Sequence, residues 1–152
     1  DSSGFAPCTA EAVVEVLKAN NIKIAGKRAV IVGRSMVVGK PLAMLLMKEN
    51  ATVTVCHTKT ADLPGMCRSG EILVAAAGRA KMIGGDYVGA GAAVIDVGIN
   101  VDDSGRLCGD VDLDAIQEKA SMATPVPGGV GAVTTAVLAR HLALAAARQE
   151  RT

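Results

Sequence analysis

The sequence predicts an α/β fold in which a doubly wound, mainly parallel sheet is flanked by helices. Short apolar runs alternate along the chain with longer segments whose leucine, valine or alanine residues recur at helical spacing. Such alternation is typical of consecutive strand–helix–strand units. Most of these runs are apolar at every position rather than at every second one, as expected for strands that are buried on both faces.

The first half of the chain holds two predicted helices and two predicted strands. The first helix is expected to start at Thr9, its N-cap, and to continue to about Asn20. The apolar run 29–32 is the first predicted strand, and the helix that follows it covers 37–50. The second predicted strand, 52–56, is rich in valine and threonine, which favour strands.

The second half continues the same pattern with shorter elements. The predicted elements are, in order, strands at 72–75 and 93–95 with a turn and short helix at 84–87 between them, a helix at 112–120, a strand at 122–124 and an alanine-rich helix at 130–148. Asp112 is expected to cap its helix, and 102–105 is read as a solvated turn without metal-ligand spacing. His141, on the last helix, is expected at the surface or the edge.

Composition indicates one folded domain over 1–152 and excludes several functions. The 152 residues are 50% hydrophobic and 20% charged, which excludes intrinsic disorder. A net charge of +1 and a content of one Phe, one Tyr and no Trp argue against nucleic-acid binding. No uninterrupted apolar run reaches 18 residues, so no membrane span is expected. The four cysteines form no close pair, which indicates reduced thiols in the cytoplasm and no metal site.

A glycine turn follows the first predicted strand. Gly33, Arg34 and Ser35 come directly after the strand, and Gly39 stands at the start of the next helix. The free N–H groups at a helix start bind phosphate, so a strand, a glycine turn and a helix together suggest a nucleotide site. The spacing differs from the common Gly-x-Gly-x-x-Gly because Ser35 replaces the middle glycine. A simple strand-to-helix turn without a ligand is the alternative.

The end of the second strand suggests which nucleotide would bind. An NAD site usually has an acidic residue there, which accepts hydrogen bonds from the ribose 2′-hydroxyl. This chain has His57, Thr58 and Lys59 instead, and Arg34 could reach the same place from the first turn. Donors and a cation suit a 2′-phosphate, so we expect NADP rather than NAD or S-adenosylmethionine. The alternative is that these side chains are solvated loop residues.

Three later segments also end strands or precede a helix. They are 76–78, 96–100 and the loop 124–131, which contains two prolines and three glycines. Open α/β sheets bind ligands at the carboxyl ends of their strands. Asp96 therefore either faces a ligand or is a buried acid that accepts turn amides, and the Pro-Gly loop either contacts a second ligand or only leads into the helix.

The sequence shows no residues that could carry out the chemical step of an enzyme. A hydride-transfer or hydrolytic site needs a group that handles protons. The chain has no Gly-x-Ser-x-Gly segment, and Gly91 stands four residues after Tyr87, so no Tyr-x-x-x-Lys pair exists. We assign no catalytic residue in this chain.

Several motifs, taken in order, resemble a known family. They are Pro7-Cys8-Thr9, Gly33-Arg34-Ser35 with Gly39-x-Pro41, Ile95-Asp96-Val97-Gly98-Ile99-Asn100, Gly109-Asp110-Val111 and Thr124-Pro125-Val126-Pro127-Gly128-Gly129-Val130-Gly131. The chain resembles the Rossmann-like cofactor-binding half of bifunctional methylenetetrahydrofolate dehydrogenase–methenyltetrahydrofolate cyclohydrolase. The resemblance covers nearly the whole chain.

The resemblance implies both an activity and residue roles. Enzymes of this family use NADP to oxidise 5,10-methylenetetrahydrofolate and then hydrolyse the methenyl product to 10-formyltetrahydrofolate, in one-carbon metabolism and purine biosynthesis. Gly33, Arg34 and Ser35 would bind the cofactor phosphates, joined at the 2′-phosphate by His57 and Thr58. The implied nicotinamide and ribose contacts are Val37, Gly78, Val97 and Ile99, with hydroxyl contacts from Thr9 and Thr134, and the implied folate-facing loop is Pro127, Gly128, Gly129 and Val130.

The chain departs from the family pattern at three places. Ala10 follows the leading Cys-Thr where most members have Pro, and Ala132-Val133-Thr134 replaces Pro-Met-Thr. The amino-terminal half, which carries the family's Tyr-x-x-x-Lys pair and most folate contacts, is absent from this chain. The resemblance further implies a cytoplasmic homodimer. A non-catalytic nucleotide-binding module and another NADP oxidoreductase, such as a relative of shikimate dehydrogenase, are the alternatives.

Overall fold

The computed structural model describes residues 4–149, so each end of the predicted domain 1–152 extends three residues beyond them. The elements are α1 (Cys8–Ala19), β1 (Arg28–Val32), α2 (Gly39–Lys48), β2 (Thr52–Cys56), α3 (Leu63–Arg68), β3 (Ile72–Ala75), the 3₁₀ turn η1 (Gly85–Tyr87), β4 (Ala93–Asp96), β5 (Asn100–Val101), β6 (Leu107–Cys108), α4 (Leu113–Ile116), β7 (Met122–Ala123) and α5 (Val130–Gln149). Five of the strands form a parallel sheet in the order β2–β1–β3–β4–β7. The predicted fold class is confirmed.

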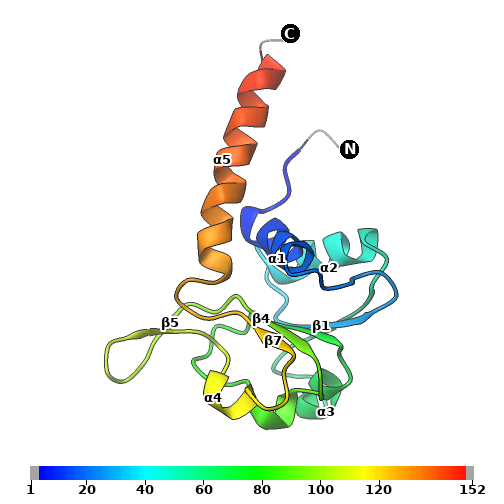
Figure 1. The fold of residues 1–152 in the computed structure, drawn as a ribbon, viewed down its shortest axis with the longest axis vertical. Coiled ribbons are helices and arrows are strands. Elements are labelled where there is room, and N and C mark those ends of the chain that lie inside the picture. Colours follow the sequence, from blue (N-terminus) through cyan, green and yellow to red (C-terminus); the bar gives the residue numbers. More distant parts are fainter. Residues whose placement is uncertain (1–3, 150–152) are drawn as a thin grey trace.

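Helices cover both faces of the sheet, with α1, α2 and α5 on one side and α3, η1 and α4 on the other (Figure 1). Successive strand residues point to opposite faces, so Ile31 packs with α1 and α2 whereas Val30 and Val32 pack with Cys67 of α3. Both sets are buried. This double burial explains why the strands read as continuous apolar runs in the sequence.

The strand order reverses at β1, and this reversal places the candidate site. From β1 the chain moves first to β2 on one side and then to β3 on the other. In the register, Val32 lies opposite both Cys56 and Ala75, and Ala75 lies opposite Asp96. The strand ends therefore meet at one edge, where the loops beginning with residues 33, 57, 76 and 97 come together.

The predicted strands are all present, and the differences concern short or irregular elements. The helix expected from residue 37 begins at Gly39, and the helix expected over 112–120 is reduced to α4, with Asp112 as its cap. The helix α3 and the β5–β6 hairpin were not predicted. The helix α3 is only six residues long, with Asp62 as its cap and Pro64 in its first turn, so it shows too little periodicity to be recognised in the sequence.

The N-cap prediction for Thr9 is wrong. The helix α1 begins at Cys8, and Pro7, which makes no side-chain cap hydrogen bond, occupies the N-cap position. Thr9 is therefore the second residue of the helix, where its side chain lines a cavity. Proline presets the backbone angle that starts a helix, which explains why it precedes the threonine here.

The prediction of a surface or edge position for His141 is also wrong. His141 is only 8% exposed, and its Nε2 lies 2.7 Å from Oε2 of Glu11 on α1. The ring of Phe5 stacks on the imidazole with 4.5 Å between the centroids. The neighbouring Arg140 forms ion pairs with Glu11 and Glu15. The contact between α1 and α5, 130 residues apart in sequence, explains the burial.

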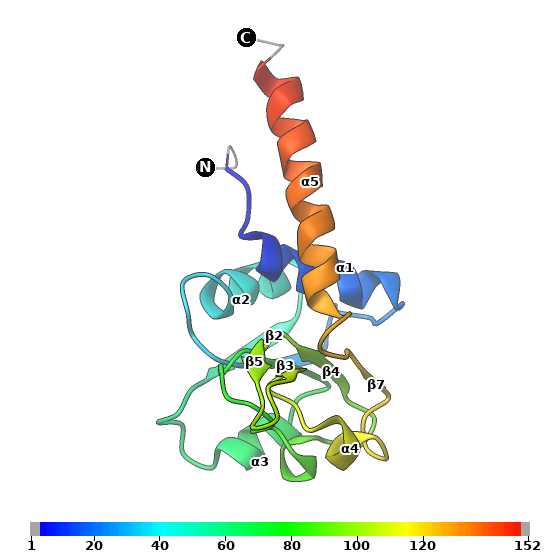
Figure 2. The ribbon, with the colours of Figure 1, turned by 90° about the vertical axis from the view of Figure 1, so that its left-hand side faces the viewer.

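The helix α5 projects away from the sheet and its covering helices (Figures 1 and 2). Leu138, Leu142 and Leu144 on it are exposed. By length and composition, α5 is the one helix within 4–149 that could cross a membrane. The sequence expectation of no span counted only uninterrupted apolar runs, and Arg140 interrupts this one. That expectation stays a prediction.

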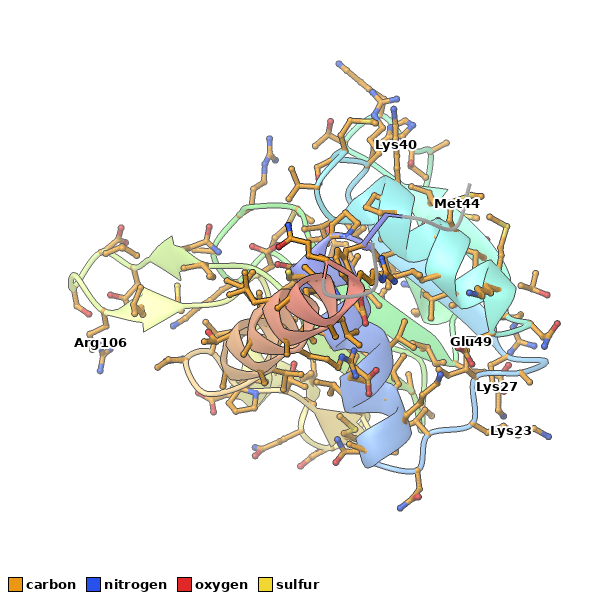
Figure 3. All side chains as sticks on the ribbon, turned by 90° about the horizontal axis from the view of Figure 1, so that it is seen from above. Lys23, Lys27, Lys40, Met44, Glu49 and Arg106 are labelled. Atoms are coloured by element: carbon orange, nitrogen blue, oxygen red, sulfur yellow. The ribbon has the colours of Figure 1, made fainter. Side chains whose placement is uncertain are left out.

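Seen from above, the β5–β6 hairpin extends sideways from the body, on the side opposite α2 (Figure 3). Arg106 lies at its tip, whereas Met44 of α2 marks the other side. Ile99, Val101 and Leu107, in or beside the hairpin strands, are 73%, 64% and 53% exposed. An apolar surface is therefore presented on a projecting arm.

Candidate functional site

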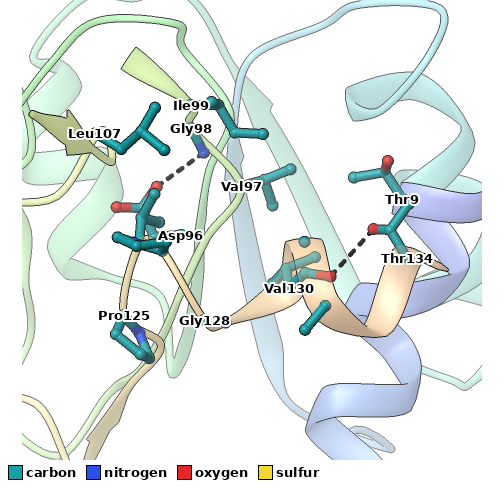
Figure 4. A pocket seen from close by; sticks show the side chains of 15 residues that line it. Thr9, Asp96, Val97, Gly98, Ile99, Leu107, Pro125, Gly128, Val130 and Thr134 are labelled. Atoms are coloured by element: carbon teal, nitrogen blue, oxygen red, sulfur yellow. Dashed lines mark hydrogen bonds between the residues drawn. The ribbon is translucent and has the colours of Figure 1, made fainter. Parts of the chain in front are cut away.

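Two cavities lie along the edge formed by the carboxyl ends of the strands. The first, here called the loop cavity, has a volume of about 370 Å³ and lies between the end of β4 and the start of α5 (Figure 4). The second, the turn cavity, has a volume of about 270 Å³ and lies over the ends of β1, β2 and β3. Together they border the strand order reversal, where open α/β sheets bind ligands.

The glycine turn after β1 requires glycine at two positions. Gly33 has a φ of +131°, and a Cβ there would overlap the carbonyl oxygen of Ala76. A Cβ at Gly39 would overlap the carbonyl oxygen of Gly33. The glycine at the start of α2 therefore allows the helix to approach the turn itself. The close approach leaves the backbone of the turn open to a ligand.

Ser35 organises the turn before α2. Its Oγ accepts hydrogen bonds from the N–H groups of Val38 and Gly39, at 3.0 and 3.5 Å. The hydroxyl proton of Ser35 is then free to be donated, because those bonds use only the oxygen lone pairs. A donating hydroxyl beside a helix start suits a phosphate oxygen.

Arg34, His57 and Thr58 line the turn cavity. The exposed Arg34 makes no hydrogen bond or ion pair with another residue that the structure describes. The Nδ1 of His57 accepts the N–H of Lys59 at 3.1 Å, so in a neutral ring the proton lies on Nε2, which can donate. No carboxylate is among the residues that line this cavity. The donor set fits a dianionic group.

The loop cavity combines apolar walls with hydroxyl groups. Val97 and Ile99 come from the end of β4, Thr9 from α1 and Thr134 from α5 (Figure 4). The hydroxyl of Thr134 donates to the carbonyl oxygen of Val130 at 3.1 Å, so its lone pairs remain available to accept. This cavity can take a flat, partly apolar ring with polar groups at its rim.

The loop before α5 forms one wall of the loop cavity. Pro127, Gly128, Gly129 and Val130 all line it. The Val126–Pro127 peptide bond is cis, and Gly128 has a φ of +95°. Because Gly128 and Gly129 have no side chains, the backbone of this loop faces the cavity directly.

Asp96 is a buried acid that accepts turn amides, which was one of the two roles left open. It accepts the N–H groups of Gly98, Asp110 and Val111 at 2.8, 3.0 and 2.9 Å. Burial raises the pKa of Asp96, and the three N–H donors partly offset that rise. Its own N–H donates to Oγ1 of the buried Thr124. Asp96 thus joins β4 to two loops and to the end of β7.

Asp110 is the site residue that sequence reasoning missed. It is fully buried, and its carboxylate accepts the N–H groups of Ala77, Gly78 and Arg79 at 2.6, 2.9 and 2.8 Å. It also accepts the side-chain amide of Asn100 at 2.8 Å. The available signal was the Gly109-Asp110-Val111 motif, to which no role was assigned.

Two of the predicted cofactor contacts lie outside both cavity walls. Val37 is 66% exposed in the turn before α2. Gly78 follows β3 with a φ of +67° and gives its N–H to Asp110. All other predicted site residues line one of the two cavities.

The chain has the features of a Rossmann-like dinucleotide-binding domain. These are a doubly wound parallel sheet, a glycine turn after its first strand and cavities at the strand ends. Residues 7–150 match the family described as "Tetrahydrofolate dehydrogenase/cyclohydrolase, NAD(P)-binding domain". The chain belongs to this family, as its motifs led us to expect.

Curated relatives and solved structures agree with this membership. The chain is 58% identical to the bifunctional protein FolD of Clostridioides difficile over 142 residues, and 60% identical to that of Carboxydothermus hydrogenoformans over 143 residues. Each match covers 93% of this chain and 50% of the relative. The chain thus spans about half the length of these relatives.

A solved structure of the Trypanosoma brucei dehydrogenase–cyclohydrolase (FolD), complexed with NADP cofactor and inhibitor, superposes with a TM-score of 0.90 at 43% identity. The superposition covers 97% of this chain and 52% of that one. The bifunctional enzyme of Campylobacter jejuni gives a TM-score of 0.87 at 47% identity, over 90% and 49% of the two chains.

Proposed function

We propose that this chain binds NADP as the cofactor half of a methylenetetrahydrofolate dehydrogenase–methenyltetrahydrofolate cyclohydrolase. The preference for NADP over NAD rests on the hydrogen-bond donors that line the turn cavity. Arg34 and the Nε2–H of His57 are donors, Thr58 adds a hydroxyl, and no acid stands at the end of β2. An NAD ribose hydroxyl would lack its usual carboxylate partner there, whereas a 2′-phosphate would meet a cation.

The phosphates and the nicotinamide would take adjacent places along the edge. The turn of Gly33, Arg34 and Ser35 would bind the phosphates through its backbone and the Ser35 hydroxyl. The nicotinamide would enter the loop cavity, with Val97 and Ile99 excluding water and Thr9 and Thr134 contacting polar groups. We further place Val37 and Gly78 near the bridging ribose, between the two cavities.

The second reactant would be a reduced folate facing the loop of Pro127, Gly128, Gly129 and Val130. The bound NADP supplies the hydride acceptor for oxidation of 5,10-methylenetetrahydrofolate, and hydrolysis of the methenyl product gives 10-formyltetrahydrofolate. This chain holds the cofactor and part of the folate surface. The groups that move protons would come from an amino-terminal domain, consistent with relatives twice as long. We assign no catalytic residue and no metal site within 1–152.

The amino-terminal domain would cover the projecting part of α5. Exposed Leu138, Leu142 and Leu144 are poorly suited to water, and a neighbouring domain would bury them. We prefer this domain contact to a membrane span as the explanation for the apolar surface of α5. The four cysteines are free thiols, which supports the cytoplasm as its location.

The assembled enzyme would be a homodimer. The β5–β6 hairpin supports this proposal, since it projects from the body and presents the apolar Val101 and Leu107. Two copies of such an arm could bury these side chains against each other. Sedimentation of the full-length protein measures this directly, and a monomer at micromolar concentration would contradict it.

Calorimetric titration of the 152-residue chain with NADP, and then with NAD at the same salt concentration, tests the proposed cofactor. We expect binding of NADP at least about tenfold tighter, because one charge-assisted contact contributes roughly 1.5–3 kcal/mol. Equal affinity for the two cofactors would contradict the role of the turn cavity. The chain alone should not oxidise the folate substrate, and robust activity without the amino-terminal half would contradict the division of roles.

A further inference from the structure

A cysteine, a histidine and a glutamate lie in series where α1 meets α5. The Sγ of Cys8 is 3.6 Å from Nδ1 of His141, and Nε2 of the same ring is 2.7 Å from Oε2 of Glu11. We propose that Cys8 is an activated thiol that reacts with small peroxides, with His141 as its base and Glu11 as the group that orients the base. This inference does not rest on the proposed function.

The hydrogen-bond roles follow from the carboxylate. An ionised carboxylate only accepts, so the contact with Glu11 requires a proton on Nε2 of His141. In a neutral ring, Nδ1 then presents its lone pair to the thiol of Cys8. A nucleophile beside a base that a third group orients is the arrangement that activates cysteine and serine side chains in enzymes.

The surroundings hold the imidazole in place. The ring of Phe5 stacks on it at 4.5 Å with an interplanar angle of 25°. Arg140 donates to Glu11 and, at 3.1 Å, to Glu15, so the orienting carboxylate is itself held by an ion pair. The guanidinium of Arg148 lies 4.7 Å from the centre of the Phe5 ring, on which it makes a cation–π contact.

Cys8 differs from the other three cysteines in both exposure and partner. Cys56, Cys67 and Cys108 are buried, whereas Cys8 is partly exposed. Burial raises the pKa of Cys67 to about 12, which leaves it protonated and unreactive. The imidazole of the other histidine, His57, accepts the N–H of Lys59 through Nδ1 and so does not act as a base toward the neighbouring Cys56. The three buried cysteines therefore serve as internal controls for the reactivity of Cys8.

The reaction balances with the peroxide as the oxidant. His141 accepts the thiol proton of Cys8, and the thiolate sulfur attacks one peroxide oxygen. A sulfur–oxygen bond forms while the oxygen–oxygen bond breaks, and the leaving hydroxide takes the proton back from His141 as water. The sulfur is oxidised to a sulfenic acid and the peroxide is reduced. A peroxide is small enough to reach this partly exposed thiol.

Trapping the sulfenic acid of the intact chain tests the proposal. The protein is treated with hydrogen peroxide in the presence of dimedone, and the adduct at each cysteine is timed by peptide mass spectrometry. We expect labelling at Cys8 but not at the three buried thiols. His141→Asn should slow labelling at least about tenfold, since a positioned base contributes at least that much. Glu11→Gln, which keeps the shape of the side chain, should slow it severalfold.

The matched control is Glu118→Gln, which makes the same Glu-to-Gln change at an exposed glutamate of the loop after α4 and should leave the Cys8 rate unchanged. Circular dichroism establishes that each variant is folded. An unlabelled Cys8 in the wild-type chain would overturn the proposal. So would an unchanged rate in folded Glu11→Gln and His141→Asn, because the Cys8–His141 contact would then be only structural. Equal labelling of Cys67 would overturn it as well, since the thiol would have no special reactivity.

Discussion

The backbone N–H of Asp110 donates to Oδ1 of Asp96 at 3.0 Å, so two buried carboxylates act in series beneath the ends of β3 and β4. Asp96 accepts amides from the loops after β4 and β6. Asp110 accepts the three successive amides of residues 77–79 after β3. The loops that border both cavities are therefore fixed to each other through side-chain oxygens, and the four hydrogen bonds that Asp110 accepts leave it no acceptor position for a ligand.

Replacing Asp110 by Asn should destabilise the fold and weaken dinucleotide binding together. The amide keeps the shape of the side chain, but its NH₂ group would face N–H donors that now have no acceptor. We expect a loss of about 2–3 kcal/mol in the free energy of unfolding, the scale of charged hydrogen bonds that are left unmade. Chemical denaturation measures the loss, and calorimetry with NADP measures the binding.

Asp112→Asn is the matched control for this change. Asp112 stands two residues away and accepts a single, long bond of 3.4 Å from the N–H of Ala115 at the start of α4. Asparagine is also a good N-cap, so this variant should lose less than about 1 kcal/mol. Equal losses for the two variants would mean that the 77–79 contacts add nothing.

The sequence predicted the sheet because its signals are local. Runs such as 29–32 and 72–75 are apolar at every position, and burial on both faces explains the pattern completely. The glycine turn was equally local, since Gly33 and Gly39 stand at fixed distances from the first strand. The N-cap role of Asp112 could be predicted because helix capping involves only the next three residues of the chain.

What the sequence did not predict depends on distant partners. His141 is buried because Phe5 and Glu11, at the other end of the chain, lie against it. The role of Asp110 requires the turn at 77–79 to come within hydrogen-bond distance, which no periodicity encodes. The short helix α3 does have local signals, the Asp62 cap and Pro64 in its first turn, but its six residues are too few to show a helical periodicity.

Arg34→Ala should separate the two cofactors. The guanidinium lies at the turn cavity without a protein partner within 4–149, so its removal leaves no other group unsatisfied. We expect NADP to bind roughly ten- to a hundredfold more weakly and NAD to be nearly unchanged, because only NADP carries the 2′-phosphate. Calorimetric titration of both cofactors measures the effect.

The control for Arg34 is Arg106→Ala at the tip of the β5–β6 hairpin, which removes one positive charge far from the turn. It should leave both affinities unchanged. If Arg34→Ala weakens NAD as much as NADP, the residue shapes the turn rather than binding the 2′-phosphate.

Gly33→Ala should affect both folding and binding. A methyl group at Gly33 meets the carbonyl oxygen of Ala76 in a backbone conformation with positive φ. Strain and overlap together should cost about 2–4 kcal/mol in the free energy of unfolding. Gly91→Ala, with a φ of +77° but open space around it, should show only the smaller cost of the strained backbone. Thermal denaturation compares the two, and losses of equal size would contradict the steric role of Ala76.

Asp102 should make the β5–β6 hairpin sensitive to acid. The hydroxyl of Ser104 donates to Asp102 at 2.6 Å, and this bond, with the N–H groups of Arg106 and Ser104, lowers the pKa of Asp102 from 3.8 to about 2. Because the folded state favours the ionised form, the stabilisation is complete above the ordinary pKa. It is lost as the pH falls from about 3.8 toward about 2.

An NMR titration of the Asp102 carboxyl carbon tests this in the wild type and in Ser104→Ala. The wild-type midpoint should lie near 2, and the variant should move it upward toward 3.8, because the largest cause of the lowered pKa has been removed. Ser69→Ala is the control, since that hydroxyl bonds only to the carbonyl oxygen of Met66 in α3. If the midpoint does not move in Ser104→Ala, the backbone amides and Arg106 hold the charge by themselves, and the role given to the Ser104 hydroxyl is wrong.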